Sequence, residues 1–145
     1  MTGSTSTTAT ITSTTFTDTN LTATITPSST SSKILIFICQ AVYIYRNSPQ
    51  IAGGVRLVRN GTMINQGHSD GTGGLNPYLE GTGVSAQYYS HWWNMHHIDS
   101  PSSTSALTYK TQGQVRQTSN GSTIQFQTAS NTTNLSTIVL QEIAQ

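Results

Sequence analysis

The sequence is poor in charged residues. Only 8% of its 145 residues are Asp, Glu, Lys or Arg, against about 25% in an ordinary soluble domain. The six basic residues are scattered and the formal net charge is +1. No basic run can therefore neutralise several phosphates, which argues against nucleic acid as a partner. Ser and Thr make up about a third of the chain. A surface of hydroxyls and amides resists association poorly, so we expect an assembled state.

Long apolar runs and cysteines are also scarce. No stretch approaches the roughly 20 apolar residues of a membrane span. The N-terminus lacks the basic start and apolar segment of a signal peptide, so we expect synthesis in the cytoplasm without secretion and no membrane partner. The single cysteine, Cys39, cannot form an internal disulfide. It lies in the apolar run from Ile34 to Ala41, which is typical of a small buried hydrophobe.

Catalytic motifs are missing as well. The sequence contains no G-x-S-x-G, P-loop or H-E-x-x-H pattern. Its five acids are far apart along the chain: Asp18, Asp70, Glu80, Asp99 and Glu142. Paired carboxylates could still meet in three dimensions, but nothing in the sequence argues for it. We therefore expect no enzyme, no catalytic residue and no cofactor.

The residues that are present predict β-structure. Leu21, Ala23 and Ile25 alternate with threonines, the pattern of a half-buried strand. Residues 33–45 predict the strongest strand. Its early part, 34–38, is apolar on both faces, so we expect it to be covered by the opposite sheet and by another element or subunit.

Regularly spaced turns separate the predicted strands. Asn60-Gly61 predicts a hairpin, residues 119–122 predict a second, and residues 100–103 predict a turn. Gly113 is expected to kink or bulge its strand. About eight strands and no helical period predict an all-β antiparallel β-sandwich of jelly-roll type over residues 16–145.

Two segments are expected to lie outside this regular framework. Residues 1–15 are almost entirely Thr and Ser, so we expect a mobile or partner-bound extended arm, with Thr7 and Ile11 as capsid or subunit contacts. The Gly-rich stretch from residue 66 to residue 83 predicts a long loop. Its His68, Asp70 and Tyr78 are candidate partner contacts.

Four aromatic residues crowd one predicted strand. Tyr88, Tyr89, Trp92 and Trp93 lie within residues 84–98. Neighbouring strand residues point to opposite faces, so the two tryptophans cannot both be in the core. We expect one to pack inside and the other to lie on a subunit contact or an exposed sugar-binding face.

The same strand also contains candidate metal ligands. Residues two apart share a face, so His97 and Asp99 could point the same way, with His91 further along. Imidazoles and a carboxylate would suit zinc, and His68 with Asp70 form a weaker pair of this kind. This spacing is only weakly specific, and His96 and His97 are better explained as polar positions near the end of an aromatic strand or in a subunit contact. No metal is therefore predicted.

Several segments resemble a known family. They are T-I-T-P-S-S-T-S-S-K-I-L-I at 24–36, L-V-R-N-G-T at 57–62, D-S-P-S-S-T-S at 99–105 and L-Q-E-I-A at 140–144. Together they resemble a small structural module of tailed phages of marine bacteria and cyanobacteria. The resemblance covers about residues 20–144 and includes no catalytic residues.

The resemblance implies a virion structural protein. The first role is a capsid decoration (cement) protein on the outer surface of the phage head, binding the major capsid protein and itself as a homotrimer. The alternative role is a tail or head fibre component, or a receptor-binding tip, that recognises a glycan on the host surface. The short chain, without a long shaft, favours decoration.

Overall fold

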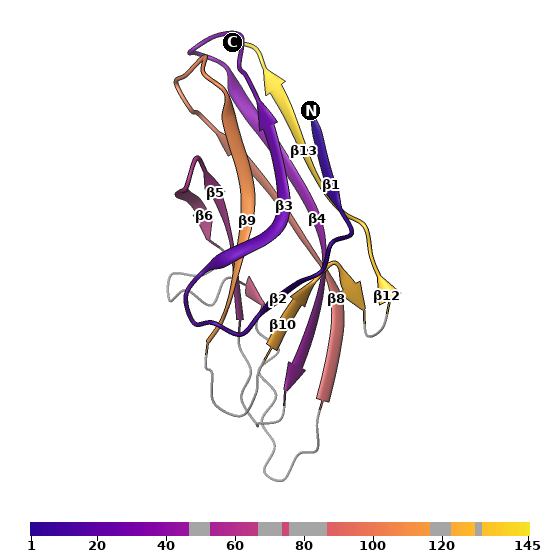
Figure 1. The fold of residues 1–145 in the computed structure, drawn as a ribbon. Coiled ribbons are helices and arrows are strands. Elements are labelled where there is room, and N and C mark those ends of the chain that lie inside the picture. The colour runs from indigo at the N-terminus through magenta and orange to yellow at the C-terminus, as the bar shows by residue number, and fades with distance from the viewer. Residues whose placement is uncertain (47–52, 67–73, 76–86, 117–122, 130–131) are drawn as a thin grey trace.

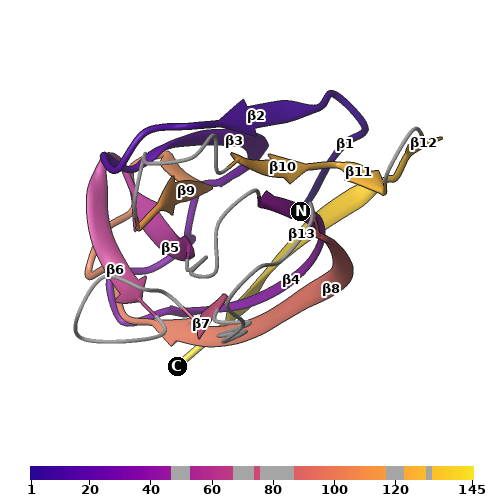
Figure 2. The same cartoon turned by 90° about the horizontal axis from the view of Figure 1, so that it is seen from below.

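The computed structural model describes residues 1–46, 53–66, 74–75, 87–116, 123–129 and 132–145. These residues form two antiparallel sheets that pack against each other (Figures 1 and 2). They contain no helix, so none is present there that could span a membrane. The predicted all-β antiparallel sandwich is confirmed, while its jelly-roll connectivity remains a prediction.

The large sheet has six strands and is organised around β4. Its members are β1 (Thr2–Thr5), β13 (Ser136–Ile143), β4 (Lys33–Arg46), β10 (Thr123–Phe126), β2 (Ala9–Ile11) and β8 (Gln87–Asp99). On one side of β4, β13 pairs with its first half and β10 with its second half. On the other side, β8 pairs with β4 along its whole length. The predicted strand over residues 33–45 is therefore the centre of the sheet.

The small sheet has five strands and faces the large one. They are β3 (Thr17–Ile25), β9 (Leu107–Val115), β5 (Gly53–Arg59), β6 (Thr62–Gln66) and β7 (Gly74–Leu75). A separate short ladder joins β11 (Thr128–Ala129) to β12 (Thr132–Thr133) between β10 and β13.

The N-terminal segment corrects the prediction of a mobile or partner-bound arm. β1 pairs with β13, and β2 pairs with β10. Ala9 and Ile11 are buried in the chain's own core. Two apolar side chains suffice because backbone pairing along two existing strands supplies the rest of the attachment. Residues 1–15 thus complete the large sheet.

Local turn chemistry was predicted well in one place and poorly in another. Asn60 and Gly61 both have positive φ, at 48° and 86°, and connect β5 to β6 as the Asn-Gly pair predicted. The bulge expected at Gly113 was wrong, because β9 pairs with β5 through this residue without a shift. The irregularity lies in β3, between Asp18 and Thr22. Gly113 instead leaves room for the Phe126 ring, which a Cβ at this position would overlap.

The core consists of two apolar clusters. One contains Tyr109 with Leu21, Ala23, Ile25, Ile34, Ile36, Ile38, Leu57, Leu107, Ile138 and Leu140. The other contains Phe126 with Ala9, Ile11, Val42, Ile44, Val55, Val115 and Ile124. Trp93 packs against both clusters.

A group of buried polar side chains lies between the two apolar clusters, next to the middle of β4. Gln40 Nε2 donates a hydrogen bond to Thr19 Oγ1 at 2.8 Å. The Thr19 hydroxyl also contacts the Thr111 hydroxyl from β9. This group links the two sheets through side chains. Because buried hydrogen-bonding groups need specific partners, it also fixes how the sheets align.

Some predicted features fall outside the described residues. The hairpin at 119–122 lies there, as does most of the loop from 66 to 83. Within that stretch the structure places Gln66 at the end of β6, and residues 74–75 form β7.

Candidate functional site

The outward surface of the large sheet carries the most unusual side chains of the described structure. Strand alternation places the even-numbered residues of β4 in the core and its odd-numbered residues outside. The outward positions of the three central strands form what we call the outer face. They are Leu35, Phe37, Cys39, Ala41, Tyr43 and Tyr45 on β4; Tyr88, Ser90, Trp92, Asn94, His96 and Ile98 on β8; and Thr137, Val139, Gln141 and Ile143 on β13.

The outer face is rich in apolar and aromatic side chains, and several of them are exposed. None of these positions is an Asp, Glu, Lys or Arg. Lys33, the first residue of β4, adds one exposed cation at the end of this side of the sheet. Phe37 is 48% exposed, Trp92 49%, Ile98 55% and Tyr88 63%. No described residue covers these side chains. The prediction that residues 34–38 are apolar on both faces is confirmed, and the small sheet covers the inner one. Cover of the other face by a subunit remains a prediction.

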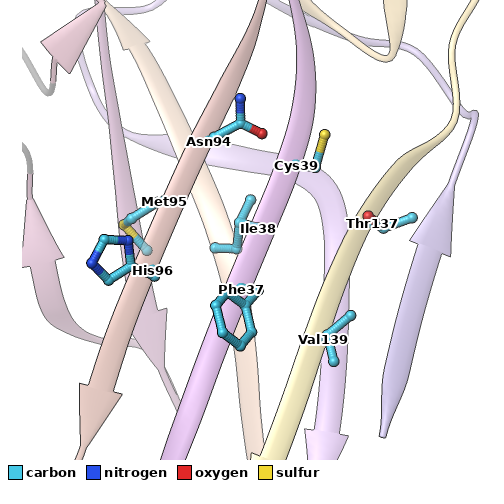
Figure 3. Close-up of a pocket in the computed structure, with 8 residues that line it drawn as sticks. All are labelled: Phe37, Ile38, Cys39, Asn94, Met95, His96, Thr137 and Val139. Carbon is cyan, nitrogen blue, oxygen red and sulfur yellow. The ribbon is translucent and has the colours of Figure 1, made fainter.

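A hollow of about 300 Å³ lies in the middle of the outer face (Figure 3). Phe37 and Val139 form one part of its lining, and Cys39, Asn94 and Thr137 another. These residues come from β4, β8 and β13, which neighbour one another in the sheet. The lining is mainly apolar with a few hydrogen-bonding groups, so it suits an inserted apolar side chain better than a charged ligand.

Cys39 is not the fully buried hydrophobe that the sequence predicted. It is half-buried and unpaired by any disulfide, with its side chain on the outer face. The error came from reading a whole apolar run as core, although alternate residues of a strand point to opposite sides.

The aromatic residues of β8 divide as predicted. Trp93 points inward and packs on the core, whereas Trp92 points outward. Tyr88 lies on the outer face and stacks with Tyr43 at 5.9 Å between ring centroids. Tyr89 is on the inner side of β8, 5.2 Å from the His91 ring. Whether any of the four contacts a partner remains a prediction.

The other predicted contacts do not join this surface. Ile11 is only 3% exposed, so a role as a capsid or subunit contact is wrong for this fold. Thr7 is exposed between β1 and β2. His68, Asp70 and Tyr78 lie outside the described residues.

The suggested metal ligands are held in other contacts. Asp99 Oδ1 and Oδ2 accept hydrogen bonds from Arg59 at 2.7 and 2.6 Å. Asp99 Oδ2 also accepts one from the Tyr109 hydroxyl at 2.7 Å. His97 Nδ1 lies 3.0 Å from Asn65 Nδ2 on β6. His91 is on the same face of β8, but no group of three metal-ligating residues forms within the described ranges.

These contacts form a clamp between the two sheets. Burial and the hydrogen bond to Asp99 raise the pKa of Tyr109 well above its usual range. Burial would lower the pKa of Arg59, but the Asp99 carboxylate outweighs it and raises that pKa. Asp99 thus ties the end of β8 to β5 and β9. No sequence pattern predicted this partnership, because Arg59 lies 40 residues before Asp99 in the chain.

The other two described acids also make structural contacts. Asp18 accepts hydrogen bonds from Lys110 and Gln112. Glu142 accepts bonds from the backbone and the hydroxyl of Ser28, each at 2.7 Å. The nearby hydroxyl groups of Ser32 and Ser28 lower the pKa of Glu142. Each of these carboxylates therefore has an evident role in holding the fold.

Phe37, Val139 and Ile98 are outer-face residues that the sequence analysis did not single out. Two sequence features could have pointed to this surface: residues 34–38 are apolar on both faces of their strand, and Val139 has an outward position on its strand. Comparison with protein-family models found no match, and comparison with curated proteins found no similar chain.

Proposed function

We propose that the protein is a virion structural protein, a capsid decoration protein that binds the outer surface of a tailed-phage head. The observation that carries the proposal is the exposed outer face of the large sheet, whose central part holds no charged side chain. Protein interfaces are depleted of charge at their centre and enriched in aromatic side chains. The outer face has both properties, and the resemblance to phage modules supplies the partner, the major capsid protein.

The size of the outer face also suits a protein partner. β4 and β8 run side by side over 13 residues, and β13 adds 8 residues. At about 3.4 Å per residue and about 4.8 Å between strands, the three strands span roughly 550 Å². A standard interface buries about 800 Å² on each partner. The face is therefore of the right order for a specific contact, with the hollow beside Phe37 as a natural central pocket.

The N-terminal segment does not carry this proposal. Because residues 1–15 are part of the large sheet, they are not available to reach across to the capsid. Attachment through the outer face would stabilise the capsid shell by mass action, because a decoration protein that binds only the assembled shell shifts the equilibrium towards it.

The test is binding to virus particles. Purified protein is mixed with separated heads and tails of the phage that encodes it, and the particles are imaged by cryo-electron microscopy. We expect regular density over the shell. Phe37→Lys, which puts a charge at the centre of the outer face, is expected to abolish that density. Thr24→Lys, an exposed change on the small sheet, serves as the matched control. Equal occupancy by both variants would count against the outer face.

A receptor-binding fibre tip is the second candidate. The half-exposed rings of Trp92 and Tyr88 favour it, because flat aromatic faces stack on sugars. Density confined to tails or fibres would support this role, and a glycan array would then identify the sugar. Absence of density on both heads and tails would contradict both candidates.

A further inference from the structure

β8 is an unpaired edge of the large sheet. Within the described part of the chain its ladder partner is β4 alone, and the pairing runs from Gln87 to Asp99 without a register shift. At about 3.4 Å per residue, the 13-residue strand presents an edge about 44 Å long. An edge of this kind offers backbone donors and acceptors to another strand.

The backbone groups on this edge can be assigned from the rest of the sheet. Ala41 O accepts a hydrogen bond from the Gln127 amide, and the Ala41 amide donates to Ser136 Oγ. Odd-numbered residues of β4 therefore point their backbone groups away from β8, and even-numbered ones towards it. The bonds of Leu140 on β13 agree with this assignment. Its amide and carbonyl both bond to Met1, so the even-numbered residues of β13 point their backbone groups away from β4.

It follows that the odd-numbered residues of β8 bond to β4. The even-numbered residues direct their N–H and C=O groups to the free edge. These are Tyr88, Ser90, Trp92, Asn94, His96 and Ile98, the same residues whose side chains lie on the outer face. The free edge and the outer face are thus continuous.

Nothing on β8 protects this edge. Natural proteins block open edges with lysine, proline, bulges or short strands. β8 contains no lysine, arginine, glutamate, glycine or proline. Its one acid, Asp99, is neutralised by Arg59. Two copies of β8 could therefore lie side by side without bringing like charges together.

The opposite border of the sheet is closed, and this limits the geometry. Gly3 of β1 packs so closely on β3 that a Cβ would overlap the Thr22 carbonyl oxygen. Beside β2, the Val115 amide donates to Ser13 O, and Asn20 Nδ2 donates to the carbonyls of Thr7 and Thr8. A head-to-tail ring would need two open borders, whereas a two-fold pair needs one on each copy.

We propose that two copies of the chain pair through β8, antiparallel and about a two-fold axis. Full overlap of the strands places Trp93 on the axis, facing Trp93 of the partner subunit. Trp92 then lies opposite Asn94 of the partner subunit, and Ser90 opposite His96 of the partner subunit. In this register all six even-numbered residues exchange backbone hydrogen bonds. The two outer faces join into one continuous apolar surface.

This pairing does not depend on the proposed virion role, and it is tested on the isolated protein. Sedimentation velocity over the micromolar range is expected to give about twice the 15.6 kDa of one chain. Amide hydrogen exchange by NMR reports the edge directly. The even-numbered amides of β8 are expected to become protected as concentration rises, while the odd-numbered ones stay protected throughout. Contact through the outer face alone would not produce this alternation.

Variants separate the edge from the face. Asn94→Pro removes an edge N–H without breaking a bond to β4, and Asn94→Lys adds a charge at the same place. Both are expected to weaken pairing at least tenfold. Thr137→Lys is the matched control, because Thr137 lies in the same row of the outer face, beyond Cys39 and away from the edge. Circular dichroism verifies that each variant folds, and Asn94→Lys suffices if the proline variant does not.

Three outcomes would overturn the proposal. The first is a monomer at all concentrations with rapidly exchanging even-numbered amides. The second is a trimer, which the resemblance to phage modules implied. The third is an oligomer that Thr137→Lys disrupts and the Asn94 variants do not. Capsid binding in any of these cases would leave the proposed function standing.

Discussion

At one border of the large sheet the chain covers its own backbone. At the other border, no strand among the described residues pairs with the outer edge of β8. The closed border consists of β1 and β2, short segments of mostly Thr and Ser that pack against β3. The open border is one long strand rich in aromatic residues. Small and mostly polar side chains line the closed border, whereas large aromatic side chains line the open border.

This difference suggests a division of labour. The closed border prevents edge-to-edge growth on one side at little cost in core volume. The open border is held to the small sheet by side chains, through Asp99 with Arg59 and Tyr109 and through His97 with Asn65. Changes at the closed border should therefore affect folding, whereas outward changes at β8 should affect association only.

Removal of residues 1–15 is expected to have the largest effect. It exposes the borders of β13 and β10 and uncovers the core cluster around Phe126. Ile11→Ala alone should cost about 2 to 5 kcal/mol, and the deletion should cost more, comparable to the total stability of a typical domain of about 5 to 15 kcal/mol. Urea unfolding followed by circular dichroism measures both. A truncated chain with the wild-type midpoint would show that the closed border contributes nothing.

Substitutions at the adjacent residues Trp92 and Trp93 are expected to give the next largest difference in stability. Trp93 packs on both core clusters but is only partly buried, so Trp93→Ala should cost about 2 to 3 kcal/mol, below the usual about 3 to 5 for a buried Trp. Trp92→Ala, one residue away on the outer face, should change the monomer's stability by less than about 0.5 kcal/mol. Chemical unfolding at a concentration low enough to prevent association provides the comparison. Equal losses would show that β8 has no distinct inner and outer sides.

The clamp at the end of the open border gives a pH-dependent prediction. The raised pKa of Tyr109 means that its neutral form stabilises the fold fully below the unfolded value of about 10. That contribution is lost as pH rises beyond it. Tyr109→Phe should cost about 1.5 to 3 kcal/mol at neutral pH, because a hydrogen bond to a carboxylate is removed.

The same variant isolates the tyrosine's share of alkaline unfolding. Above about pH 10 the wild type should lose stability more steeply than Tyr109→Phe. Unfolding midpoints measured across this range test the difference. Parallel curves for the two proteins would show that the phenol is not linked to folding.

Sequence reasoning succeeded where one local rule decides the structure. Alternation in residues 21–25 predicted β3, and the backbone freedom of Asn60-Gly61 predicted its hairpin. The opposite directions of Trp92 and Trp93 followed from the strand period alone. Each of these depends on neighbours in the chain, so no knowledge of the other strands was needed.

It failed where a distant segment decides. Residues 1–15 look too polar to fold, yet β13 and β10 offer them complete backbone pairing. Gly113 looks like a bulge, but the reason for glycine there is the Phe126 ring from another strand. The outer face could not be predicted from the sequence, because it depends on the pairing of β13, β4 and β8 in one sheet. Part of the candidate site was therefore predictable as single aromatic residues, but not as a surface.

The smallest expected effect concerns His91, a partly buried residue on the inner side of β8. Burial lowers its pKa, and its Nδ1 is buried without a hydrogen-bond partner in the described structure. The folded protein therefore holds the neutral ring, whereas the unfolded chain takes up a proton below about pH 6.5. This stabilisation is present above that pH and declines as pH falls through the lower folded value. His91→Gln should flatten the decline without changing stability at pH 8, as thermal unfolding at both pH values would show. If stability declines with falling pH as much in the variant as in the wild type, burial of the His91 ring does not contribute to folding. The inner side of β8 would then be open to water at this residue, so the open border would be less well covered than the closed border on its inner side as well.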